Sequence, residues 1–129
     1  MHRQPTAVRL RPRVAARFLV RYCIEGAEHE LRGGVATDLS EAGLFLHDPY
    51  TASLELGTRL HLGLDAGGGE LVAAAAVIVH RRSEGCGLRF EWLTPEHQRR
   101  LAALLDSRRR EIFSSLLRQT QRELARRPA

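Results

Sequence analysis

The chain has 129 residues, enough for one domain with a single ordinary core, and 43% of them are hydrophobic, so we expect one folded unit. No apolar run approaches the roughly 20 residues that span a bilayer, and the first residues lack a secretory signal. The two isolated cysteines exclude a disulfide framework. A cytoplasmic protein without a membrane span is therefore predicted. All 20 basic residues are arginine. Residues 1–21 carry six arginines and no acid, a net charge of +6, and residues 96–129 carry nine arginines and four acids, a net charge of +5. Between them, residues 22–95 carry five arginines and 11 acids, a net charge of −6.

Six short segments rich in β-branched, aromatic or alternating apolar residues predict six β-strands. They cover residues 17–24, about 29–39, 44–46, 60–64, 71–79 and 88–90. Turn residues such as Asp48-Pro49 and the glycine-rich run 65–69 separate them. The Gly33-Gly34 pair indicates a bulge or a sharp bend of the kind that barrels use at corners.

A helix is predicted after the strands, because Thr94 is a capping residue, Pro95 suits the first helical position and Glu96 lies in the first turn. Its pattern runs to about Arg126. Six short strands and a terminal helix imply a mainly β fold, a small antiparallel barrel.

We divide the chain into three parts. They are a basic N-terminal arm at 1–16, a barrel with the first part of the helix at 17–107, and a basic helical extension at 108–129.

The predicted helix carries two apolar faces. Leu101, Leu104, Leu105 and Ile112 share one face, which we expect to pack on the barrel. A second stripe follows a 4-3-4 spacing on a face rotated by ~100°. It consists of Phe113, Leu117, Thr120 and Leu124. One helix cannot press both faces onto one small barrel, so the distal stripe either bends back or meets another chain, by self-association or by docking on an effector protein.

The segment 38–43 places a carboxylate, a hydroxyl and a glycine at one turn between predicted strands. One interpretation is an ordinary turn, in which Asp38 and Ser40 bond to local backbone and Gly43 adopts a positive φ. The other is a polar surface that recognises a ligand with hydrogen-bonding bases. An arginine cluster at residues 9–13 supplies the opposite charge and favours an anionic ligand.

These motifs resemble those of a known family. Arg9-x-x-x-Arg13 followed by Asp38-x-Ser40-x-x-Gly43 is similar to the two signature motifs of the PilZ domain family. The later run 85–90 and the helix opening at 94–96 fit the same family, and the resemblance covers about residues 7–107. It implies a six-stranded antiparallel barrel that binds cyclic di-GMP, a bacterial second messenger.

The resemblance also implies residue roles. In the family the two motif arginines grip guanines and phosphates, which assigns Arg9 and Arg13 as a clamp. Asp38, Ser40 and Gly43 would hold a guanine edge. The chemistry of the residues agrees, because a guanidinium fork matches guanine O6 and N7 and also grips phosphate oxygens. A carboxylate accepts hydrogen bonds from guanine N1–H and N2–H₂, and glycine lets the backbone approach a flat base.

Three further positions bear on the ligand. His80 stands where some relatives place a tryptophan that stacks on the ligand, although a lone histidine is more often a surface residue. Arg11 lies between the clamp arginines and adds either a phosphate contact or only charge. Val8 precedes the first motif where other members have a further arginine, which favours one bound ligand molecule over an intercalated pair.

The expected function is a non-catalytic cyclic di-GMP receptor whose arm orders on the ligand and signals to a partner protein. No metal-ligand pattern, nucleophile elbow or phosphate-binding loop is present, so no enzyme and no metal are expected. Two alternatives stay open: a PilZ-like adaptor that binds no nucleotide, and a basic barrel that binds nucleic acid. Sparse aromatics and the acidic middle argue against nucleic acid.

Overall fold

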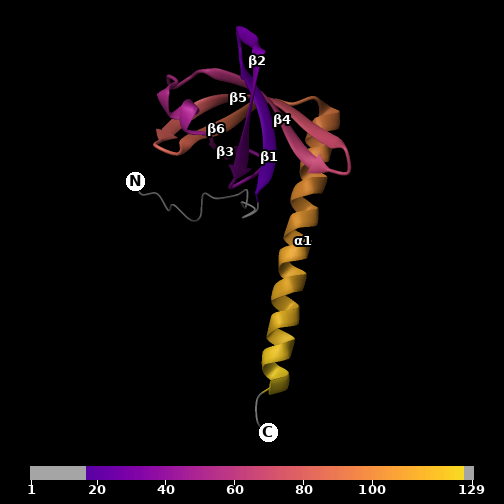
Figure 1. The fold of residues 1–129 in the computed structure, drawn as a ribbon. Coiled ribbons are helices and arrows are strands. Elements are labelled where there is room, and N and C mark those ends of the chain that lie inside the picture. Colours follow the sequence, from indigo (N-terminus) through magenta and orange to yellow (C-terminus); the bar gives the residue numbers. More distant parts are fainter. Residues whose placement is uncertain (1–16, 127–129) are drawn as a thin grey trace, which may run out of the picture.

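The computed structural model describes residues 17–126, which form a six-stranded barrel followed by one long helix (Figure 1). The elements are β1 (Phe18–Ile24), β2 (Ala27–Thr37), β3 (Gly43–His47), the 3-10 helix η1 (Pro49–Ser53), β4 (Arg59–Gly67), β5 (Glu70–Arg82), β6 (Gly85–Trp92) and α1 (Pro95–Arg126). The strands close in the order β1-β2-β3-β6-β5-β4, and every neighbouring pair is antiparallel. The predicted mainly β barrel with a terminal helix is therefore confirmed.

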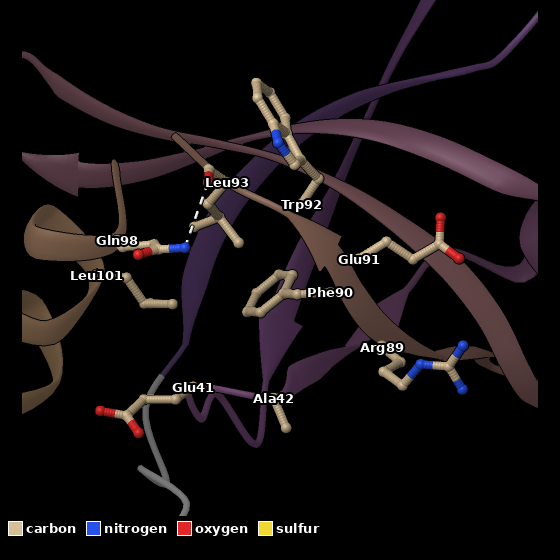
Figure 2. Close-up of a pocket in the computed structure, with 9 residues that line it drawn as sticks. All are labelled: Glu41, Ala42, Arg89, Phe90, Glu91, Trp92, Leu93, Gln98 and Leu101. Carbon is tan, nitrogen blue, oxygen red and sulfur yellow. Dashed lines mark hydrogen bonds between the residues drawn. The ribbon is translucent and has the colours of Figure 1, made fainter. Parts of the chain in front are cut away.

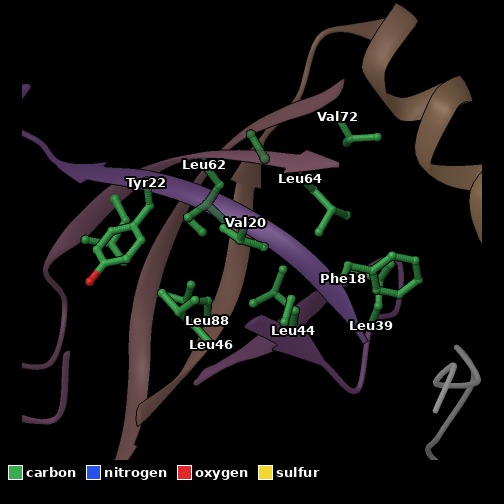
Figure 3. Close-up of a cluster of buried hydrophobic side chains, with 14 of the residues drawn as sticks. Phe18, Val20, Tyr22, Leu39, Leu44, Leu46, Leu62, Leu64, Val72 and Leu88 are labelled. Atoms are coloured by element: carbon green, nitrogen blue, oxygen red, sulfur yellow. The ribbon is translucent and has the colours of Figure 1, made fainter. Parts of the chain in front are cut away.

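The core lies inside the barrel and follows from strand alternation. Phe18, Val20 and Tyr22 of β1 are buried while the residues between them are exposed, because successive side chains point to opposite faces. Figure 3 shows these side chains converging with leucines of β3, β4 and β6. The first turns of α1 add a further layer through Leu101, Leu104 and Leu105, which belong to the same buried cluster.

A buried polar contact joins β1 to η1. The Tyr22 hydroxyl donates to Asp48 Oδ2 at 2.6 Å, and Asp48 Oδ1 accepts from the Tyr50 backbone N–H at 3.2 Å as the cap of η1. Burial, with the neighbouring Asp48 carboxylate, raises the pKa of Tyr22 well above its usual range. The sequence predicted that Asp48-Pro49 ends the third strand, which is confirmed, but η1 was not anticipated.

Of the bulge or sharp bend predicted at Gly33-Gly34, the bulge is not present. Both residues pair regularly with β1, and the register of that strand pair shifts further on, between Tyr22 and Ile24. Gly34 has a different reason to lack a side chain. A Cβ there would lie 2.9 Å from Leu46 Cδ1 and 3.0 Å from the His47 carbonyl oxygen, so the glycine lets β2 and β3 approach.

Helix α1 is continuous over 32 residues and extends well past the barrel (Figure 1). Leu101, Leu104 and Leu105 pack on the barrel as predicted, but Ile112 does not, since it is 42% exposed. The reason is length: residue 112 lies about 10 Å along the axis beyond Leu105, at 1.5 Å per residue, where the barrel no longer covers the helix. Residues 111–126 are all exposed, so the distal stripe does not bend back.

Candidate functional site

The loop between β2 and β3 holds the Asp-x-Ser-x-x-Gly motif in a fixed local structure. The Ser40 backbone N–H donates to the Gly43 carbonyl at 2.9 Å, and Ser40 Oγ accepts from the Ala42 N–H at 3.1 Å. Ser40 is buried, so its hydroxyl mainly shapes the loop, as in the ordinary-turn interpretation. Asp38 is exposed and takes a left-handed conformation with φ 55°, which aspartate tolerates better than most residues.

Gly43 is required for packing rather than for a left-handed turn. The positive φ that the turn interpretation assigned to Gly43 belongs to Asp38 instead. Gly43 opens β3 opposite Arg89 of β6, and a Cβ on it would lie 1.9 Å from the Leu88 carbonyl oxygen. The missing side chain therefore lets the backbones of β3 and β6 come together, which supplies a reason for the glycine that involves no ligand.

A surface hollow of about 380 Å³ lies against this loop and is here named the motif hollow. It is lined by residues of the loop and of three strands, β3, β5 and β6: Asp38, Ser40, Ala42, Gly43, Leu44, Phe45, Val79, His80, Arg82, Gly87, Leu88 and Arg89. Four residues that the sequence singled out, Asp38, Ser40, Gly43 and His80, therefore meet in one place.

Aromatic and cationic side chains form one wall of the motif hollow. The rings of Phe45 and His80 lie 5.9 Å apart at a tilt of 30°, and the Arg82 guanidinium carbon lies 5.0 Å from the centre of the Phe45 ring. The His80 ring rests on Gly87, where a Cβ would lie 2.0 Å from its Cε1 atom. The fifth strand was predicted to end at residue 79, but β5 continues to Arg82 and includes His80. These groups offer a flat surface with a positive charge beside it.

Two arginines of the motif hollow were missed by sequence reasoning. Arg82 follows His80 by two residues, so the alternation of a strand places both on one face. That signal was available in the sequence. Arg89 pairs with Gly43 across β3 and β6, a contact that only the closed barrel creates. Both are exposed, and both can supply charge to an anionic ligand.

A second hollow of about 550 Å³ adjoins the first and shares Ala42 and Arg89 with it. Figure 2 shows Phe90 in its middle, with Leu93 and Gln98 on one side and Glu91 on the other. The Gln98 side chain donates to the Leu93 carbonyl at 3.4 Å, which ties the start of α1 to the end of β6. This hollow therefore lies between the motif loop and the base of the helix.

The predicted clamp residues Arg9, Arg11 and Arg13 lie outside the described residues. Their point of attachment can nevertheless be located. The described chain enters β1 at Phe18, which pairs with Ala36 of β2, two residues before Asp38. The described chain therefore begins beside the motif loop.

Within residues 17–126 no helix is long and apolar enough to cross a membrane. The same residues contain no group of three or more His, Cys, Asp or Glu side chains that could hold a metal ion.

A family model for the PilZ domain matches residues 7–107. The chain belongs to the PilZ domain family. PilZ domains are non-catalytic receptor or adaptor domains, which agrees with the expectation that this chain is not an enzyme. No curated protein matches the chain.

Several solved structures share the fold at low sequence identity. The PilZ domain of YcgR from Escherichia coli, solved with c-di-GMP, has a TM-score of 0.65 at 17% identity and covers 84% of this chain and 97% of its own. The PilZ domain of CeSA from a cellulose-synthesizing bacterium has a TM-score of 0.61 at 18% identity, covering 74% and 95%. The inhibitor of motility MotI/DgrA from Bacillus subtilis has a TM-score of 0.61 at 19% identity, covering 87% of this PilZ chain and 52% of its own.

Proposed function

We propose that this PilZ domain is a receptor that binds cyclic di-GMP in the motif hollow and passes the signal to another protein. The proposal is carried by one observation: the hollow gathers Asp38, Ser40, His80 and two arginines next to the point where the arginine arm joins the barrel. The PilZ domain of the Escherichia coli protein, which has the same fold, was solved with this ligand.

The lining residues suit the ligand. Cyclic di-GMP has two guanines and two phosphates, so it needs donors to O6 and N7, acceptors for N1–H and N2–H₂, and positive charge. Asp38 is exposed and offers the acceptors, while Arg82 and Arg89 offer donors and charge. His80 and Phe45 present ring faces on which a base can stack.

The arm completes the site in this proposal. Arg9 and Arg13 would close over the ligand as it binds, with Arg11 adding charge toward the phosphates. Ordering the backbone of one residue costs ~1–2 kcal/mol, and one charge-assisted hydrogen bond returns roughly 1.5–3 kcal/mol. Several such bonds must therefore form together, which makes the ordering of the arm a switch that depends on the ligand.

The deciding experiment is calorimetric titration of the full chain with cyclic di-GMP. We expect tight binding that is lost in Arg13→Ala and Asp38→Ala, because the first removes a clamp donor and the second removes the guanine acceptor. Glu30→Ala is the matched control for Asp38→Ala, since Glu30 is an exposed acid of β2 that does not line the motif hollow. Cyclic di-AMP, which has the same phosphates but no guanine edge, should bind far more weakly.

Other results would point elsewhere. Equal affinity for both dinucleotides would show that the protein recognises only the phosphates, which would contradict the role given to Asp38. No heat and no thermal shift with either ligand would leave a PilZ-like adaptor without a nucleotide. Salt-sensitive binding of single-stranded RNA in place of cyclic di-GMP would support the nucleic-acid alternative.

A further inference from the structure

The part of α1 beyond the barrel exposes an apolar surface that the chain itself does not cover. Residues 108–126 extend the helix by about 28 Å at 1.5 Å per residue. Here Phe113 is 66% exposed, Leu116 58%, Leu117 47% and Leu124 57%. Neighbouring exposed apolar side chains of this size mark an interaction surface rather than ordinary scatter.

The spacing of these residues suits another helix. Phe113, Leu117, Thr120 and Leu124 repeat at intervals of four, three and four, the pattern whose side chains insert between those of a facing helix. Leu116 lies beside this line and widens it. Together with Leu116, the four residues of the distal stripe form one apolar face, and in the described structure all five residues are exposed.

From Phe113 onward, the arginines of α1 are kept away from the distal stripe, whereas Arg109 and Arg110 lie on its side of the helix just before it. At 100° per residue, Arg118, Arg122 and Arg126 lie roughly 140–180° from the centre of the stripe. The positions directly beside the stripe include Ser114, Gln121 and Glu123. Over residues 113–126, two copies of this face can therefore meet without apposing arginines, although the helix as a whole is basic.

We propose that the distal stripe packs against the distal stripe of a second copy of this chain, forming a homo-oligomer through α1. An anionic membrane or an acidic partner would be favoured by arginines flanking the stripe along its length, whereas Arg118, Arg122 and Arg126 lie on the opposite side of the helix. The apolar face itself supplies the attraction. This inference stands on the helix alone and does not depend on cyclic di-GMP binding.

The test is the mass of the full chain in solution, by light scattering across a dilution series. We expect at least twice the chain mass of 14.5 kDa, and a single-chain mass for Leu117→Glu. Ser115→Glu is the matched control, because it adds the same charge to an exposed position on the opposite side of the helix. Raising the salt concentration should leave the oligomer intact or strengthen it, since salt screens repulsion between the basic helices.

Three results would overturn the proposal: a single-chain mass at every concentration, association of Leu117→Glu equal to that of the unaltered chain, or equal disruption by both substitutions. Sedimentation with phosphatidylglycerol vesicles, lost in Leu117→Glu while the free chain is monomeric, would assign the stripe to a membrane instead. Circular dichroism checks that each variant folds. Leu117→Glu should retain cyclic di-GMP binding and Asp38→Ala should retain self-association, so failure of one proposal is distinguishable from failure of the other.

Discussion

The guanidinium carbon of Arg108 in α1 lies 5.2 Å from the centre of the Phe18 ring in β1. Phe18 is buried at the start of β1, close behind the segment that carries the arginine motif. Arg108 follows Leu105, the last buried residue of α1, by three residues. One cation–π contact therefore connects the attachment of the arm with the base of the exposed helix, the two parts that the proposed signal has to join.

Arg108→Ala should lower the free energy of unfolding by about 0.5–1 kcal/mol, the usual value of a cation–π contact at a partly exposed site. The substitution also removes an ion pair with Glu111, at 3.2 Å. Thermal unfolding followed by circular dichroism measures the effect. Arg110→Ala, a nearby substitution of an exposed arginine, is the control. Equal losses in the two variants would mean that the contact with Phe18 contributes nothing.

Gly43→Ala should destabilise the barrel whether or not ligand is present. The new Cβ would meet the Leu88 backbone, which cannot move aside as a flexible side chain can. We expect a loss of about 1–3 kcal/mol in chemical denaturation, typical of an overpacked interior. Gly33→Ala is the matched control, because its Cβ would lie at an ordinary 3.8 Å from the Val20 carbonyl oxygen. A Gly43→Ala chain of normal stability that no longer binds cyclic di-GMP would reverse this interpretation.

His80→Ala should weaken cyclic di-GMP binding roughly fivefold, since one stacking contact is worth about 1 kcal/mol. His80→Trp should strengthen binding, because the larger ring offers more stacking area. Calorimetry with His61→Ala provides the comparison, as His61 is an exposed histidine of β4 that lies 3.4 Å from Glu25 and does not line the motif hollow. Unchanged affinity in His80→Ala would leave this residue as a surface histidine.

Tyr22 should make the fold sensitive to alkaline pH. Its pKa is raised in the folded state, so above the unfolded value of about 10 the unfolded chain loses a proton that the folded chain keeps. Stability is then full below pH 10 and falls by about 1.4 kcal/mol per pH unit above it. Unfolding free energies at successive pH values should show this slope in the unaltered chain and a shallower one in Tyr22→Phe. The buried Cys86 thiol, whose pKa is also raised, contributes equally to both. Parallel slopes would contradict the assignment to Tyr22.

Much of the fold could be predicted because its signals are local. Alternation along the strands and the Thr94-Pro95 cap located all six strands and the start of α1, and α1 is helical to the last described residue, Arg126. The errors concern tertiary context. Ile112 continues the face of Leu101 on a helical projection, but no projection shows where the barrel stops covering the helix.

The site was predictable only in part. A sequence motif identified Asp38, Ser40 and Gly43, because those residues are close along the chain. Arg89 comes from β6, and nothing in the sequence indicates that β6 pairs with β3 rather than with β5 alone. The positive φ that the turn interpretation expected at Gly43 was wrong, and the packing reason for the glycine was missed, since the carbonyl that excludes a side chain there belongs to the partner strand.

Closure of the barrel limits how this protein can associate. Every described strand has two neighbours. Unpaired backbone edges are therefore confined to stretches where a strand extends beyond the paired residues of its neighbour. The largest of these is in β2, which pairs with β3 only over residues 35–37. The preceding part of β2 carries Glu28, His29, Glu30 and Arg32, side chains of the kind that discourage strand addition. The surface proposed for self-association lies on the protruding helix, apart from the strand edges. Substitutions on that helix can therefore change the number of associated copies without exposing a strand edge to which another chain could add.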